Sequence, residues 1–182
     1  ENPYPRWTVN PLTAFAADLA RGRTVATAEQ QAERDILIAG CGTGSHAIQI
    51  AQVYPKARLL AVDISMTSLA YARRKTRELG LRNVEYAQAD ILELGSIDRS
   101  FDSIESVGVL HHLAEPLAGW KALVSLLRPG GVLVAPIASA SLFMGMGIAL
   151  KVADGATRAS EAAITALLVH HGFLEANHPV VD

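Results

Sequence analysis

Short apolar runs alternate along most of this chain with segments whose apolar residues recur at helical spacing. The predicted strands are 35–39, 58–62, 84–88, 101–107 and 132–136, and in 84–88 and 101–107 polar residues lie among the apolar ones. The segments with helical spacing are 44–53, 65–79 and 116–127. Alternating strands and helices are typical of parallel βαβ units, and the crossovers in such units are right-handed. The pattern therefore predicts an α/β fold: a doubly wound, mostly parallel Rossmann-like sheet with helices on both faces.

The two ends of the chain depart from this alternation and predict three parts. Residues 1–30 form an arm with aromatic residues, Tyr4 and Trp7, and one helix at 11–21, and residues 31–136 form the core. Residues 137–182 are atypical: a strand-like run at 146–152 precedes an Ala-rich helical segment at 156–171.

One apolar stretch, 130–150, contains no charged residue and is long enough to span a bilayer. Glycines, a proline and serines interrupt it, so the pattern favours a buried strand, a loop and a second strand over a membrane helix.

Three features at predicted strand ends indicate a site for a nucleoside cofactor. The first strand runs into Gly40-Cys41-Gly42-Thr43-Gly44, the second ends at Asp63, and the third leads to Asp90. A glycine-rich turn lets the backbone approach a ligand closely, and a carboxylate at the end of the next strand can accept hydrogen bonds from ribose hydroxyls. Ligands of open α/β sheets bind beyond the carboxyl ends of the strands, where these residues fall.

The spacing of the glycines bears on which cofactor is expected. Dinucleotide sites have G-x-G-x-x-G/A, but the sixth position counted from Gly40 is Ser45. This departure disfavours a nicotinamide-dependent oxidoreductase.

Composition and charge narrow the function classes further. Half of the residues are hydrophobic and the formal net charge is −2, which suits a globular protein and argues against nucleic acid as a partner. The single cysteine, Cys41, excludes an intrachain disulfide and a cysteine metal cluster, so we expect no metal site and a cytoplasmic location.

In five pieces the chain resembles the class I S-adenosylmethionine-dependent methyltransferases. The pieces are the glycine loop, the acidic end 61–65, Gln88-Ala89-Asp90-Ile91, the segment 101–113, and 126–131. The resemblance implies S-adenosylmethionine as the cofactor, with the loop at its methionine part, Asp63 at the ribose, Asp90 and Ile91 at the adenine, and Ser106 and Val107 beside the methionine. The implied cofactor-binding residues are Ala39, Gly40, Cys41, Gly42, Gly44, Asp63, Ile64, Asp90, Ile91, Ser106 and Val107.

The chain also departs from that family. Ile38 stands where the family usually has Asp, and the segment after Pro136 differs from the usual helix and antiparallel hairpin. The tail, about 145–180, resembles the end of a bacterial thermolabile-type asparaginase. The opening residues 2–7 resemble the segment before this domain in some bacterial methyltransferases with tetratricopeptide repeats, which favours an upstream repeat domain that this chain lacks.

The expected reaction is methyl transfer to an unknown small-molecule or protein acceptor. The alternative is an inactive or binding-only truncated methyltransferase domain fused to an asparaginase-like tail. The sequence names no catalytic residue. His111 and His112 follow the fourth strand and can be a general base or simply the start of a helix.

Overall fold

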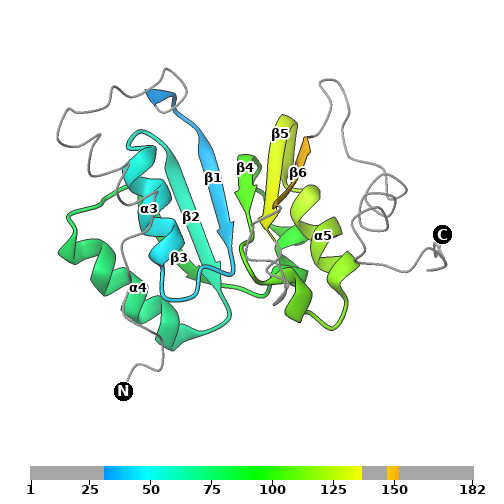
Figure 1. The fold of residues 1–182 in the computed structure, drawn as a ribbon, viewed down its shortest axis with the longest axis horizontal. Helices are drawn as coiled ribbons and strands as arrows, with labels where there is room; N and C mark the ends of the chain where they lie inside the picture. The colour runs from blue at the N-terminus through cyan, green and yellow to red at the C-terminus, as the bar shows by residue number, and fades with distance from the viewer. Residues whose placement is uncertain (1–30, 137–146, 152–182) are drawn as a thin grey trace. The chain divides into compact units, whose positions relative to one another are not determined.

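The protein's structure is a computed structural model that describes residues 31–136 and 147–151 (Figure 1). The chain divides into two compact units, 1–88 and 89–182. Each unit contains three of the strands, and each is described by itself below.

The first unit is a parallel three-stranded layer with two helices. Its strands are β1 (Asp35–Ala39), β2 (Arg58–Asp63) and β3 (Val84–Gln88), in the order β3-β2-β1. Helix α3 (Ser45–Val53) connects β1 to β2, and α4 (Met66–Glu78) connects β2 to β3. All five elements were predicted from the sequence, with ends that agree within one residue.

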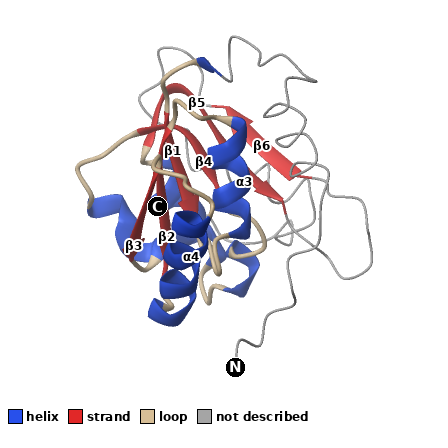
Figure 2. Ribbon diagram, turned by 90° about the vertical axis from the view of Figure 1, so that its left-hand side faces the viewer, coloured by secondary structure: helices blue, strands red, loops and turns tan. Residues whose placement is uncertain are grey.

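Both helices pack on the same face of this layer (Figure 2). The core there joins alternate strand residues, such as Ile36 and Leu59, to helix residues such as Ile50 and Leu69. The intervening strand residues, Leu37, Leu60 and Val62, are buried as well. Strands buried on both faces have continuous apolar runs, which fits residues 36–39 of β1 and 59–62 of β2.

Local chemistry fixes where α4 begins and ends. The Ser65 hydroxyl accepts a hydrogen bond from the Ser68 backbone N–H (3.2 Å), so Ser65 is the N-cap of the helix. Gly80 follows the helix with φ +71°, a left-handed conformation that favours glycine. The Asn83 side-chain amide donates to the backbone carbonyls of Ala51 and Tyr54 and so satisfies the end of α3.

The second unit contains strands β4 and β5 in parallel, and β6 antiparallel to β5. Trp120 and Leu123 of its helix α5 are fully buried. Figure 1 shows these elements in green to orange. In chain order they are η1 (Ile91–Ser96), β4 (Phe101–Glu105), η2 (Leu110–His112), α5 (Pro116–Val124), β5 (Leu127–Pro136) and β6 (Gly147–Lys151).

Element ends in this unit differ from those predicted. Strand β4 ends at Glu105, not 107, and α5 ends at Val124, not 127. Strand β5 begins at Leu127 and not at 132 as predicted. Its pairing with β4 shifts register between Leu127 and Val132, so the segment 128–131 is an irregular part of the strand. The short helix η1 (Ile91–Ser96) lies between β3 and β4, where the sequence pattern predicted no element.

Strand β6 confirms the strand-like run predicted at 146–152, and it pairs with β5 from Val132↔Lys151 to Pro136↔Gly147. An antiparallel strand therefore follows β5. The predicted helices at 11–21 and 156–171, and the aromatic residues Tyr4 and Trp7, lie outside the described residues. Within the described ranges, no helix has the length and apolar character needed to cross a membrane.

Candidate functional site: the glycine loop and the strand ends

The loop after β1 is shaped by three glycines with positive φ: Gly40 (+78°), Gly42 (+53°) and Gly44 (+86°). The backbone N–H groups of Gly40 and Cys41 both donate to the Val62 carbonyl of β2, each at 2.9 Å. These two bonds hold the start of the loop against the end of the neighbouring strand.

Asp63, the last residue of β2, fastens the middle of the loop. Its Oδ2 accepts from the Gly42 N–H at 2.7 Å, and its Oδ1 accepts from the Ser65 N–H at 2.9 Å. A carboxylate has about four acceptor positions, so two remain for a ligand's hydroxyl groups. Asp63 is therefore both the clamp of the loop and a candidate ligand-binding group.

Two of the loop glycines have different surroundings. A Cβ placed on Gly42 would meet no atom of the described residues within 4 Å, so the loop is open on that side. A Cβ on Gly44 would lie 2.6 Å from the Ala72 Cβ and 3.0 Å from the Tyr86 hydroxyl. Gly42 thus provides the surface that a ligand can approach, whereas Gly44 allows α4 and β3 to pack closely against the loop.

The first turn of α3 follows directly from Gly44. Its first intrahelical bond runs from the Ile48 N–H to the Gly44 carbonyl, so the N–H groups of the preceding residues have no acceptor within the helix. The positive end of the helix dipole lies at the same place. The loop and helix start together favour a polar or negatively charged ligand group.

Cys41 lies inside the loop and is buried, with 7 % of its surface exposed. Burial, and next the negative charge of Asp63, raise the pKa of the Cys41 thiol from 9.0 to about 12. The thiol is therefore protonated at neutral pH. Cys41 serves as a small apolar residue of the loop, because only a thiolate is a strong nucleophile.

We predict that Cys41 resists alkylation in the folded protein. At pH 8.5 the thiolate fraction is large in the unfolded chain and very small in the folded one, since the folded pKa is about 12. Iodoacetamide should react at least about 100-fold more slowly with native protein than with protein in denaturant. Because the pKa of Cys41 is higher in the folded than in the unfolded chain, the free energy of unfolding also falls as pH rises from 9 towards 12. Equal rates with and without denaturant would contradict the buried loop position.

Ile64, which follows Asp63, and Ala39, which precedes the glycine loop, differ in which of their atoms a ligand can contact. Ile64 is 67 % exposed, so its side chain is free to cover an apolar ligand group. Its carbonyl accepts from the Gln88 side-chain amide at 2.9 Å. Ala39 is fully buried, so only its backbone can contribute. Gln88 belongs to one of the five pieces of the family resemblance but was not among the implied cofactor-binding residues.

In the second unit, Asp90 and Ile91 begin η1. The Asp90 Oδ1 accepts from the Leu92 N–H at 2.9 Å and caps this short helix. The Ile91 side chain is buried towards Gly119 of α5. The buried Ile91 side chain leaves the Asp90 side chain and the backbone of these two residues as the groups that a ligand can contact.

Ser106 and Val107 follow β4 in the same unit. The Ser106 N–H donates to the Val134 carbonyl at 2.9 Å, which continues the pairing with β5. The Ser106 hydroxyl is buried and has no hydrogen-bond partner within the described part of the chain. A buried unpaired hydroxyl is uncommon and indicates a water or ligand contact. Val107 is 41 % exposed.

His111 and His112 lie in η2, and both are exposed, with ring centroids 4.0 Å apart. They lie in a three-residue turn at the surface and not at the start of the following helix α5, so the helix-start alternative is wrong. Among residues 31–136 and 147–151, no three His, Cys, Asp or Glu side chains gather as metal ligands.

Comparison with known proteins agrees with this geometry. The methyltransferase domain family matches residues 36–131, more than half of the chain. Trans-aconitate 2-methyltransferase of Deinococcus radiodurans is 38 % identical over 98 residues, which are 54 % of this chain and 35 % of that protein.

Two solved structures are also similar. An S-adenosylmethionine-dependent methyltransferase from Clostridium acetobutylicum has a TM-score of 0.53 and 27 % identity, covering 70 % of this chain and 49 % of that one. The [4+2]-cyclase SpnF has a TM-score of 0.56 and 27 % identity, covering 69 % and 44 %. These similarities confirm the predicted fold class, an α/β, mostly parallel Rossmann-like sheet.

The fold and the loop thus define a protein with a Rossmann-like methyltransferase fold. This chain belongs to the methyltransferase domain family. The chain spans less than half of the length of each of these three proteins.

Proposed function

We propose that this chain is the cofactor-binding part of an S-adenosylmethionine-dependent methyltransferase that acts on a small-molecule or protein acceptor. The observation that carries the proposal is the glycine loop, open above Gly42 and clamped by Asp63 at the end of the next strand. The matched family and the named cofactor dependence of the Clostridium relative support it.

In this proposal each loop residue has a defined task. The free acceptor positions of Asp63 take the ribose hydroxyls, and the exposed Ile64 covers the base. The open backbone at Gly42 and the first turn of α3 contact the methionine part. Asp90, which caps η1, and Ser106, whose buried hydroxyl has no partner among the described residues, are proposed as further cofactor-binding residues in the second unit.

The bound cofactor supplies an electrophilic methyl group, so the protein's own task is to position the reactants and exclude water. The chain's residues then need only hold the cofactor and align the acceptor. His111 and His112 are exposed and able to accept a proton from an acceptor that must lose one. We propose the cytoplasm as the compartment, supported by the single cysteine.

The alternative is a domain that binds the cofactor without turnover. Ile38, which is 1 % exposed, favours it because an apolar side chain occupies the position where the family has a carboxylate. Binding of S-adenosylhomocysteine without methyl transfer to any compound in a broad acceptor panel would favour this alternative.

Asp63→Ala tests the assignment of the clamp. Removing the carboxylate deletes the bonds to Gly42 and Ser65 and the acceptors for the ribose. We expect the Kd for S-adenosylhomocysteine to rise about 10- to 100-fold, since hydrogen bonds to charged groups contribute about 1.5–3 kcal/mol. Isothermal titration calorimetry measures this change.

Asp98→Ala is the matched control, because Asp98 is an exposed carboxylate in the segment before β4. It should leave the Kd unchanged. Asp63→Asn keeps one acceptor oxygen and should give an intermediate loss, which separates ligand contact from collapse of the loop. Equal affinity of Asp63→Ala and Asp98→Ala would rule out Asp63 as a ligand-binding residue.

A further inference from the structure

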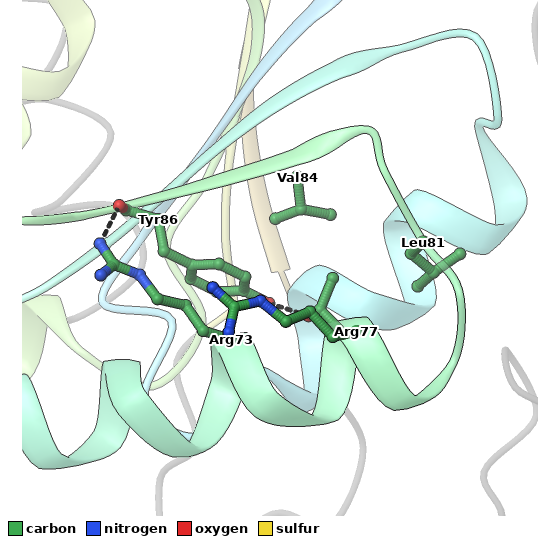
Figure 3. A pocket seen from close by; sticks show the side chains of 6 residues that line it. Arg73, Arg77, Leu81, Val84 and Tyr86 are labelled. Atoms are coloured by element: carbon green, nitrogen blue, oxygen red, sulfur yellow. Dashed lines mark hydrogen bonds between the residues drawn. The ribbon is translucent and has the colours of Figure 1, made fainter.

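A pocket lies within the first unit, between α4 and β3 (Figure 3). Its volume is about 320 Å³, and it is lined by Arg73, Thr76, Arg77, Leu81, Val84 and Tyr86. None of these residues belongs to the glycine loop or to the strand-end carboxylates. The proposed cofactor site therefore leaves this pocket unexplained.

The lining carries two positive charges and no negative one. Arg73 and Arg77 are one helical turn apart on α4, so their side chains lie on the same face of the helix. In Figure 3 both extend towards Tyr86. Glu85 of β3 points to the other side of the strand, because successive side chains of a strand alternate.

The two other cations, Arg74 and Lys75, share one acidic partner on α4. Arg74 and Lys75 both pair with Glu78, at 3.4 and 2.7 Å. The Arg77 guanidinium has no ion pair or hydrogen bond within the part of the chain that the structure describes. Two adjacent guanidinium groups without a counter-charge are a favourable place for an oxyanion, which can accept bidentate bonds from either.

The pocket is also preorganised. Arg73 Nη2 donates to the Tyr86 carbonyl at 2.6 Å, which fixes one guanidinium and leaves its remaining donors available. The Tyr86 hydroxyl and Thr76 Oγ1 share a hydrogen bond of 2.8 Å beneath it. Burial raises the pKa of Tyr86, so this floor is uncharged at neutral pH.

The remaining wall is apolar. Leu81, which follows α4, and Val84, which begins β3, lie away from the Arg73 guanidinium in Figure 3. A ligand that fits both parts has an anionic head and an apolar body. The volume of about 320 Å³ lies in the usual range for small-molecule sites.

We propose that this pocket binds a small organic anion, with its carboxylate or phosphate on Arg73 and Arg77 and its apolar part against Leu81 and Val84. The site is separate from the proposed cofactor loop and does not depend on the proposed function. It offers the domain a second ligand, of a different class from the cofactor.

The test is a titration of the ¹⁵N-labelled chain, followed by NMR amide shifts, with hexanoate, phenyl phosphate and the neutral hexan-1-ol. We expect shifts concentrated in 73–86 and a Kd of about 0.1–3 mM for at least one anion, and none for the alcohol below about 10 mM. Comparing hexanoate with phenyl phosphate shows which head group the two arginines prefer. The shifts should persist with S-adenosylhomocysteine present.

Variants supply the decisive comparison. Arg77→Gln should weaken anion binding about 10-fold or more, while Arg74→Gln, which removes an equal charge one residue along from Arg73, should change the Kd less than about 2-fold. Arg77 is exposed, so its replacement should leave the fold intact. Absence of binding, equal binding of hexan-1-ol, or equal losses in the two variants would overturn the proposal.

Discussion

Gly42→Ala is expected to abolish detectable S-adenosylhomocysteine binding while leaving the domain folded. A Cβ at Gly42 enters the open side of the loop, where the proposed ligand approaches, and meets no atom of the described residues within 4 Å. A clash with a close-fitting ligand should raise the Kd about 100-fold or more, equivalent to about 3 kcal/mol. The fold itself should lose only about 1–2 kcal/mol, the usual penalty for alanine at positive φ.

Gly80→Ala is the matched control for this change. Gly80 also has positive φ (+71°) and open space around its Cβ position, but it ends α4 away from the loop. Both variants should therefore lose similar stability in urea unfolding, and only Gly42→Ala should lose binding in calorimetry. Unchanged binding in Gly42→Ala would show that the open side of the loop is not the ligand surface.

Gly44→Ala should produce the largest loss of stability among the loop substitutions. Its Cβ would lie 2.6 Å from the Ala72 Cβ and 3.2 Å from the Ala72 Cα, and φ is +86°. The backbone of α4 cannot yield as a flexible side chain does. Overpacking together with the left-handed conformation should reduce the free energy of unfolding by about 3–5 kcal/mol.

Urea unfolding of Gly44→Ala beside Gly80→Ala measures this effect, since the second variant carries only the conformational penalty. The difference between them reports the packing of α4 and β3 against the loop. A difference below about 1 kcal/mol would mean that α4 does not pack as closely on Gly44 as the structure shows.

The sequence predicted the first unit almost completely, because its elements are marked by strong local features. β1 and β2 contain apolar runs buried on both faces, Ser65 caps α4, and Gly80 ends it. The second unit was harder to predict. Leu127 continues the helical spacing of α5, yet it begins β5, because pairing with Phe101 takes it into the sheet. Periodicity cannot show such competition between a helix end and a strand start.

The candidate site was predicted in part. The loop and Asp63 followed from spacing, but the structure adds that Asp63 also holds the loop through Gly42, and that Gly44 serves packing. Such roles depend on distances between residues far apart in the chain. The pocket of Arg73 and Arg77 could not be predicted for the same reason: the sequence shows a run of basic residues on α4, and only the position of β3 shows which of them lie beside it.

The most direct test of the account is a pair of calorimetric titrations of this chain, with S-adenosylhomocysteine and with NAD. The glycine loop and the Asp63 clamp predict binding of S-adenosylhomocysteine with a Kd of about 1–100 µM, and NAD binding that is at least about 10-fold weaker. Tighter binding of NAD, or no heat of binding with S-adenosylhomocysteine, would contradict the assignment of the loop as a methyltransferase cofactor site.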